Sequence, residues 1–298
     1  MKKISLVLIM VFSMVTFVST AMGCAAQKQV NMPVVLLTDY GSEDYRIAQL
    51  KGIIYSNNPA ARVIDASHSV PAFDIATGAF ILDVAAREFP EDLVFIGIIA
   101  PYNQPETKYL VLTNNKSQIF VLPDNGLLTH VIKDTGIKTI YQVTDEKLFD
   151  RPLKELVAER VEGKIGALIA SGYRPQDIGT PLTTYRTLDI QDPVITGPQI
   201  LGTIVYIDHY GNAVTNIPGK TVNEFGLKPG DPVNITIPQG KISAKFGAIY
   251  SDVPQGQEVV FVVNNLGMVQ LSINLGNFAV THGVKAGTKV EIELMPLL

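Results

Sequence analysis

Apolar residues in the first half of the chain alternate between short continuous runs and helical spacing. The continuous runs at 34–38 and 93–99 predict buried strands, and 62–66 predicts the strand between them. Over 45–56 and 74–89 the apolar positions instead recur every three or four residues, which predicts two amphipathic helices. Strands that are apolar throughout and alternate with helices are typical of a mostly parallel sheet covered by helices on both faces.

Beyond about residue 195 the pattern changes to short β-rich runs broken by proline and glycine. A helix ending at Gly172 closes the first half, and prolines and glycines cluster over 176–202. The later runs are 204–207, 233–237, 258–263, 269–273 and 289–294. They predict a smaller C-terminal antiparallel β-barrel-like domain. We therefore predict an α/β protein with an N-terminal α/β domain over 32–195 and a C-terminal β domain over 196–298.

The first residues have the pattern of an export signal. Lys2 and Lys3 precede an apolar run over 4–18, and small residues follow up to Cys24, the single cysteine of the chain. This pattern predicts a lipoprotein-type signal peptide over 1–23, lipidation at Cys24 and a linker over 24–31. The alternative is a plain cleaved signal with an incidental cysteine. The apolar run is shorter than the roughly 20 residues of a spanning helix.

The signal predicts an exported lipoprotein, held by its lipid anchor only, on the extracytoplasmic side of a membrane in the periplasm or at the cell surface. The formal net charge is −4 and no basic cluster follows the signal, which argues against a nucleic-acid partner. One cysteine cannot form an internal disulfide, and the four histidines are too scattered to give a zinc-binding spacing. We expect a small-molecule ligand, no cofactor and no metal.

Asp39 follows the first predicted strand directly. Ligands of open α/β sheets bind outside the carboxyl ends of the strands, and Gly41 permits a sharp turn just after Asp39. A carboxylate at this place can accept two hydrogen bonds from a cis-diol. The alternative is that Asp39 caps the following helix.

Four segments, taken in order, resemble a known enzyme family. They are residues 34–41, Pro123-Asp-Asn-Gly-Leu-Leu128, Ile207-Asp-His-Tyr-Gly-Asn212 and Asn264-Asn-Leu-Gly267. Their order and separations are similar to those of the S-adenosylmethionine (SAM) hydroxide adenosyltransferases and the related fluorinases and chlorinases. The resemblance covers nearly all of the chain after about residue 32. It implies displacement at the ribose C5′ of SAM, and a homotrimer with the ligand between the N-terminal domain of one subunit and the C-terminal domain of the next.

In the N-terminal domain the resemblance implies that Asp39 binds the ribose hydroxyls and that Asp44 lies near the methionine end of the ligand. Phe73 matches an aromatic position that packs against the ligand. Asp44 has an alternative role as an acidic residue favoured by the helix dipole, and Phe73 has one as a core residue. For Asn125, in its Pro-Asp-Asn-Gly segment, the alternative is a turn.

In the C-terminal domain the resemblance implies that Asp208 pairs with the methionine ammonium and that Asn212 meets an adenine edge, where an amide offers both a donor and an acceptor. Tyr210 stands in place of a stacking phenylalanine. Asn265 matches a polar residue at the amino-acid end of the ligand, whereas Leu266 replaces an arginine there. The alternative for the loop over 208–212 is a β-turn.

The positions that do the family's chemistry differ in this chain. Hydroxide-using members place an aspartate, an arginine and a histidine at the nucleophile, and the matching residues here are Ala100, Thr107 and Val157. The serine of the halide-using members falls on Ala158. The nearest polar substitutes are Asn103, Lys108 and Glu159.

Three interpretations remain. The first is SAM binding followed by hydrolysis to adenosine and L-methionine, with the water oriented by substitute residues. The second is a non-catalytic surface lipoprotein that binds SAM or adenosine, and the third is a structural or partner-binding lipoprotein. The catalytic residues stay unassigned at this level.

Overall fold

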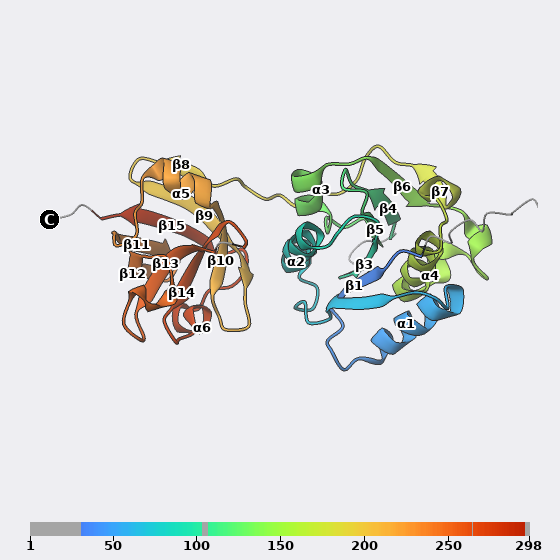
Figure 1. Ribbon diagram of the computed structural model, residues 1–298, viewed down its shortest axis with the longest axis horizontal. Helices are drawn as coiled ribbons and strands as arrows, with labels where there is room; N and C mark the ends of the chain where they lie inside the picture. Colours follow the sequence, from blue (N-terminus) through green and yellow to red (C-terminus); the bar gives the residue numbers. More distant parts are fainter. Residues whose placement is uncertain (1–30, 103–106, 264, 296–298) are drawn as a thin grey trace, which may run out of the picture.

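The computed structural model describes residues 31–102, 107–263 and 265–295. The predicted signal peptide, Cys24, nearly all of the linker and the candidate Asn103 lie outside the described residues. Figure 1 shows two domains side by side, joined by an extended segment. Within the described part of the chain, no helix is both long enough and apolar enough to cross a membrane.

The N-terminal domain is one sheet between two layers of helices (Figure 1). Its strands are β1 (Val34–Thr38), β2 (Val63–Ser67), β3 (Val94–Ile98), β4 (Tyr109–Thr113), β5 (Ile119–Pro123), β6 (Thr139–Val143) and β7 (Gly179–Pro181). Its helices are α1 (Tyr45–Asn57), α2 (Ile75–Glu88), α3 (Thr129–Thr135) and α4 (Ala158–Ala170), with single 3₁₀ turns at Glu146–Leu148, Leu153–Glu155 and Pro175–Asp177. The strand order is β2-β1-β3-β5-β4-β6-β7.

The first four strands in that order run parallel, and β4, β6 and β7 are antiparallel to their neighbours. In the β1–β3 register Thr38 lies opposite Ile98, so the carboxyl ends of these two strands meet at one edge of the sheet. The predicted fold of this domain is confirmed. The sequence pattern does not predict the antiparallel strands β4, β6 and β7.

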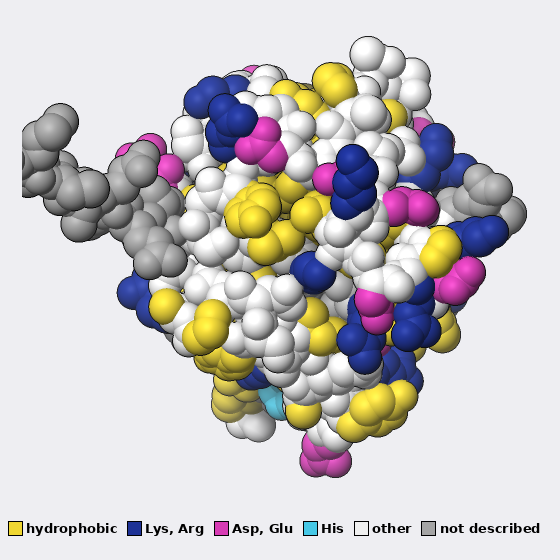
Figure 2. All heavy atoms as spheres, turned by 90° about the vertical axis from the view of Figure 1, so that its right-hand side faces the viewer, with side chains coloured by type: hydrophobic (Ala, Val, Ile, Leu, Met, Phe, Trp, Pro, Cys, Tyr) yellow, Lys and Arg dark blue, Asp and Glu magenta, His cyan; other side chains and the backbone are white. Residues whose placement is uncertain are grey.

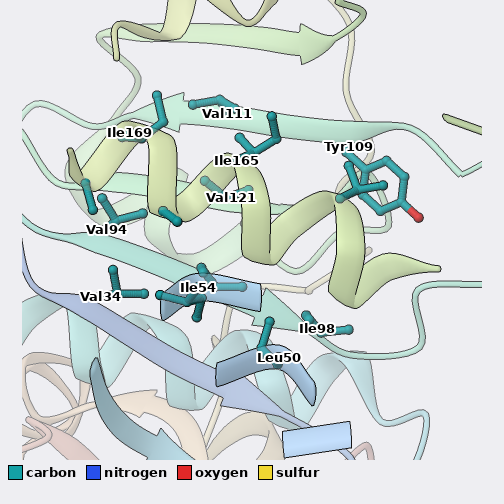
Figure 3. Close-up of a cluster of buried hydrophobic side chains, with 14 of the residues drawn as sticks. Val34, Leu50, Ile54, Val94, Ile98, Tyr109, Val111, Val121, Ile165 and Ile169 are labelled. Atoms are coloured by element: carbon teal, nitrogen blue, oxygen red, sulfur yellow. The ribbon is translucent and has the colours of Figure 1, made fainter. Parts of the chain in front are cut away.

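The apolar runs explain why the sheet is covered on both faces. Alternate residues of β1 enter different cores: Val34 packs with α1 and α4, and Val35 packs on the side of α2 and α3. Figure 3 shows part of the first core, to which Leu50 and Ile54 of α1 and Ile165 of α4 contribute. Because both faces are buried there, the central strands β1 and β3 carry apolar residues at nearly every position.

The C-terminal domain is a barrel. Its strands are β8 (Val194–Thr196), β9 (Gln199–Ile207), β10 (Ala213–Pro218), β11 (Pro232–Ile237), β12 (Gly240–Phe246), β13 (Glu258–Val263), β14 (Met268–Ile273) and β15 (Lys289–Leu294). It also contains α5 (Gly219–Phe225), α6 (Phe278–His282) and a 3₁₀ turn at Tyr250–Asp252. The order is β10-β14-β13-β12-β11-β15-β9-β8, and β9 also pairs with β10, which closes the barrel. The barrel-like domain is confirmed, with one departure from antiparallel pairing: β12 and β13 run parallel.

The segment between the two sheets makes hydrogen bonds to both domains. The Leu188 N–H donates to the Thr129 hydroxyl (2.8 Å), and the Asn216 side chain donates to the Gln191 carbonyl (2.7 Å). The rings of Phe80 in α2 and Tyr206 in β9 stack with their centroids 5.2 Å apart. These contacts join the two domains directly.

Charged and apolar side chains are interspersed on the face of the molecule shown in Figure 2. Lysine and arginine side chains on this face lie beside aspartate and glutamate side chains rather than in one continuous basic area. A nucleic-acid surface would instead carry a basic patch or stripe. This face therefore carries charges of both signs, interspersed.

Asp83 in α2 makes folding sensitive to pH. Its side chain is buried, Arg87 pairs with one carboxylate oxygen, and the other has no partner among the described residues. Burial raises the pKa of Asp83 to about 6, against the opposing charge of Arg87. A carboxyl group whose pKa is higher in the folded state stabilises the fold below its ordinary pKa and loses this contribution as the pH rises through 6.

We therefore expect Asp83→Asn to gain free energy of unfolding relative to the parent as the pH rises. Between about pH 4.5 and about pH 7.5 the difference between the two proteins should shift by about 2 kcal/mol in favour of the variant. Denaturant unfolding at the two pH values measures it. Glu88→Gln, at the exposed last position of the same helix, should show no such shift, and an equal shift in that control would contradict the assignment to Asp83.

Candidate functional site

Asp39 joins three loops at the carboxyl edge of the parallel strands. Its Oδ2 accepts the backbone N–H groups of Phe73 (3.0 Å) and Ala100 (3.1 Å), which follow β2 and β3. Both of these residues have positive φ, 66° and 42°, a conformation that is costly for side chains with a Cβ. Oδ1 of Asp39 makes no hydrogen bond to another described residue. Asp39 thus fixes two strained turns with one oxygen, and its other oxygen has no hydrogen-bond partner among the described residues.

The cap of α1 is Asp44, so Asp39 does not have the alternative role of a helix cap. Oδ1 of Asp44 accepts the Arg46 N–H (2.8 Å), and the Arg46 Nε lies 3.3 Å from the same oxygen. An N-cap carboxylate satisfies a backbone donor at the helix start and favours the helix dipole. The structure thus gives Asp44 a structural role five residues beyond Asp39.

A polar chain supports the Asp39 turn from behind. The Thr38 hydroxyl lies 2.9 Å from His68 Nδ1, and His68 Nε2 lies 3.2 Å from Asp65 Oδ1. The His68 carbonyl accepts the Gly41 N–H (2.7 Å), which closes the turn. Burial favours a higher pKa for Asp65, but the hydrogen bond from Lys51 and the nearby His68 ring outweigh it and lower that pKa. The sequence spacing of Thr38, Asp65 and His68 does not indicate this series of contacts, because Thr38 meets the other two only through the β1–β2 pairing.

Phe73 lies on the surface and not in the core. Its side chain is 79% exposed, directly beside the Asp39 carboxylate that holds its backbone. An exposed aromatic ring in a strained turn is available to pack on a ligand. Asn125 is instead buried: its side chain donates to the Ile99 carbonyl (2.8 Å) and accepts the Leu127 N–H (3.2 Å). It therefore holds the end of β3, in agreement with the turn alternative.

The three positions that match the family's nucleophile site hold no acid or base. Ala100 is buried, and the Thr107 hydroxyl donates to the Pro101 carbonyl (2.7 Å). Val157 precedes α4 without a side-chain cap. Next to it, the Ala158 N–H donates to the Tyr102 hydroxyl (2.6 Å). Of the polar substitutes, Lys108 is exposed and Glu159 is buried.

In the C-terminal domain, Asp208 and Asn212 form a closed turn between β9 and β10. Oδ1 of Asp208 accepts the N–H groups of Tyr210 and Asn212 (both 2.9 Å), and Oδ2 accepts the Asn212 side-chain amide (2.7 Å). Asp208 and Asn212 therefore form a turn, as in the alternative interpretation of this loop. The same geometry projects Tyr210 outward, with 75% of its side chain exposed.

A cavity of about 500 Å³ lies beside this turn. Its lining consists of Tyr210, Asn212, Tyr250, Ile273, Asn274, Leu275 and Gly276. Its volume is within the usual range for small-molecule sites, and a mainly apolar lining with a few amides suits a heteroaromatic ring. No sequence motif indicated Tyr250 or Leu275, because they reach the cavity from segments far from Asp208 in sequence.

Asn265 lies elsewhere. It is exposed in the turn between β13 and β14, two residues before Gly267, whose carbonyl accepts the Gly219 N–H. The cavity lies at the other end of β14, whose six residues span roughly 20 Å. The structure therefore brings Tyr210 and Asn212 together and keeps Asn265 apart from them. Among the described residues there is also no group of three or more His, Cys, Asp or Glu side chains that could hold a metal ion.

Two family models and several known proteins match this chain. Residues 34–179 match the SAM hydroxide adenosyltransferase N-terminal domain, and residues 202–291 match the C-terminal domain of the same family. The chain is 25% identical to a fluorinase of Actinoplanes sp. (strain N902-109) over 292 residues, covering 88% of this chain and 97% of the fluorinase. It is 26% identical to the (R)-S-adenosyl-L-methionine hydrolase of Methanocaldococcus jannaschii over 282 residues, covering 91% and 99%.

Among solved structures, the chain is similar to an uncharacterized conserved protein from Thermotoga maritima, with a TM-score of 0.81 and 27% identity, covering 87% of this chain and 99% of the other. A conserved hypothetical protein from Thermus thermophilus shares the fold, with a TM-score of 0.70 and 22% identity, covering 89% and 100%. The two matched domains span most of the chain in the order expected of one protein. The chain therefore belongs to the SAM hydroxide adenosyltransferase family.

Proposed function

We propose that the protein binds SAM and hydrolyses it to adenosine and L-methionine by attack of water at the ribose C5′. The observation that carries the proposal is Asp39, whose Oδ2 is used by two backbone N–H groups while Oδ1 remains for a ribose diol. The exposed ring of Phe73 borders the same place. Methionine leaves SAM as a neutral thioether, so the reaction requires a positioned, desolvated nucleophile but no metal or general acid.

Water is a better nucleophile for this site than a halide. The buried carboxyl groups of Glu159 and Glu162 lie in the first turns of α4, beside the matching position Ala158. Neither side chain supplies the positive charge or the N–H donors that an anion needs, whereas a carboxyl group in either protonation state can hydrogen-bond with water. This supports hydrolysis over halogenation, although fluorinases are among the relatives.

Exposed apolar side chains on both domains support a site shared between copies. Tyr45 and Phe73 are exposed in the N-terminal domain, and Tyr210, Leu275 and Val280 are exposed in the C-terminal domain near the 500 Å³ cavity. We propose that the first set of one subunit and the second set of another enclose the ligand in a homotrimer. Sedimentation equilibrium of the purified protein measures the assembly, and a monomer would separate Asp39 from the cavity.

A second candidate is non-catalytic binding of SAM or adenosine. It is favoured by the matching positions Ala100, Thr107 and Val157, which offer no ionisable group. The two functions predict the same binding and differ in turnover.

The test is incubation of the protein from residue 25 onward with SAM, followed by chromatography of adenosine and methionine. We expect equal amounts of the two products from the parent, and none above spontaneous breakdown from Asp39→Ala. Calorimetric titration with adenosine is run alongside. Adenosine binding without any turnover would reject hydrolysis and support the non-catalytic function.

A further inference from the structure

A second cavity, of about 320 Å³, lies between α1 and α4. Figure 1 shows these two helices on the side of the N-terminal domain that faces away from the C-terminal domain. The segment that precedes α4 forms a third wall. The described residues that line this cavity include neither Asp39 and the turns that it holds nor any residue of the β9–β10 turn. We call it the α1–α4 cavity.

Arg160 and Lys164 bring two positive charges to the α1–α4 cavity. They lie at positions i and i+4 of α4, so their side chains are neighbours on one face of that helix. Within the described ranges, neither of the two side chains makes a hydrogen bond or an ion pair. The one carboxylate among the described lining residues is Asp150, whose Oδ2 lies 3.7 Å from Nη2 of Arg151. The lining therefore carries an excess of positive charge, in a protein whose net charge is −4.

Apolar side chains form the other part of the lining. Leu156 is buried and Ile53 of α1 is half-buried. Nζ of Lys164 lies 5.6 Å from the centroid of the Phe149 ring, a cation–π contact that holds the ammonium group beside an aromatic wall. A cavity of this volume that combines apolar walls with a few charged groups is typical of a small-molecule site.

Gly52 leaves the α1 side of the cavity open. A glycine inside a helix is less stable than an alanine, so its presence calls for a reason. Gly163 of α4 has one, because a Cβ there would lie 2.9 Å from Cδ1 of Leu50 in α1. A Cβ at Gly52 would meet no atom within 4 Å. The packing of the chain therefore does not require this glycine, and the space above it belongs to the cavity that it lines.

We propose that the α1–α4 cavity binds a small organic anion. Its carboxylate or phosphate group lies between Arg160 and Lys164, and its apolar part packs against Phe149 and Ile53. A guanidinium group can donate two parallel hydrogen bonds to either kind of anionic group, and an ammonium group adds a point charge. The site is separate from the one that holds Asp39, and the inference does not depend on the proposed hydrolysis.

Four probes test which features of the ligand the cavity recognises. Benzoate and phenyl phosphate share an aromatic ring and differ in the anionic group, benzamide has the ring without the charge, and inorganic phosphate has the charge without the ring. Saturation-transfer NMR with the purified protein at constant ionic strength measures the binding of the three aromatic probes, and inorganic phosphate is measured by competition. We expect at least one aromatic anion to bind with a Kd of about 1 mM or lower. Benzamide and inorganic phosphate should bind at least about tenfold more weakly, because each lacks one set of contacts.

Two variants locate the binding. Arg160→Gln/Lys164→Gln should weaken binding of the aromatic anion at least about tenfold, because both charge-assisted contacts are lost. Arg62→Gln/Lys138→Gln removes two exposed cations elsewhere in the same domain and is the matched control, which should bind like the parent. Gly52→Leu fills the cavity from α1 and should also weaken binding at least about tenfold, without lowering the Tm, because leucine favours a helix more than glycine does.

Three results would overturn the inference. One is the absence of binding by both aromatic anions at about 10 mM. Another is equal affinity in Arg160→Gln/Lys164→Gln and in its matched control, and a third is displacement of the bound anion by adenosine, which would place it in the candidate site at Asp39. A changed sedimentation of Arg160→Gln/Lys164→Gln with unchanged probe affinity would also refute the site and assign the two cations to contacts between subunits.

Discussion

Adenosine binding to Asp39→Asn is expected to be at least about 30-fold weaker than to the parent, while the protein remains folded. The asparagine oxygen can still accept the N–H groups of Phe73 and Ala100, which now bond Oδ2 of Asp39. The amide NH₂ then takes the place of Oδ1, so an acceptor for ribose hydroxyls becomes a donor. Losing hydrogen bonds to a charged group costs about 2 kcal/mol or more, which gives the stated change in affinity.

Calorimetric titration with adenosine and thermal unfolding measure the two parts of this prediction. The Tm of Asp39→Asn should stay close to that of the parent, whereas Asp39→Ala should lose both binding and about 1–3 kcal/mol of stability, because it leaves the buried Ala100 N–H without a partner. Asp124→Asn is a matched control: Asp124 accepts the Arg186 N–H with Oδ1 and lies outside the site. Undiminished affinity in Asp39→Asn would show that Asp39 serves only the backbone.

Gly211→Ala is expected to destabilise the C-terminal domain by about 3 kcal/mol and to displace the loop that carries Tyr210. Gly211 has φ +85°, and a Cβ added there would lie 2.1 Å from Cγ of Asn277. Asn277 cannot move away without loss, because its Oδ1 caps α6 through the Val280 N–H (2.8 Å). The expected loss of unfolding free energy is the sum of three contributions. They are about 1 kcal/mol for an alanine in the left-handed backbone conformation, about 1 kcal/mol for the lost helix cap and a similar amount for the clash.

Gly226→Ala provides the matched control. Gly226 has φ +88°, and a Cβ there would meet no atom within 4 Å, so only the strain of about 1 kcal/mol applies. Chemical denaturation of both variants measures the difference, which isolates the contact with Asn277. Equal destabilisation of the two variants would contradict the close packing of the β9–β10 turn against α6.

The predicted elements were those whose burial is visible in a local pattern. The helix over 45–56 is found as α1, because Leu50 and Ile54 lie on one buried face. The strands β4 and β5 were not predicted, since an apolar run of five residues does not reveal by periodicity whether it is a strand or a buried helix segment. The parallel β12–β13 pair likewise depends on how the barrel closes.

For the candidate site, motif order and strand ends indicated Asp39 at the end of β1 and Tyr210 in the turn after β9. The same motifs gave no indication that Asn265 lies at the far end of β14 from the cavity, because β14 itself separates two segments that are close in sequence. Nor did they reveal the supporting chain from Thr38 to His68 and Asp65. Side chains that support a site without lining it follow no fixed sequence spacing that would identify them.

The sequence by itself determined the α/β and barrel architecture, the family and the acidic residue at the end of β1. These depend on local periodicity and on motifs within short segments. Only the tertiary structure decided that Asp39 binds N–H groups 34 and 61 residues away, and that the side chain of Glu162 is buried without a hydrogen-bond partner among the described residues. The reason is physical: hydrogen bonds and buried charges depend on which strands are neighbours and on their register, and a single sequence does not state either.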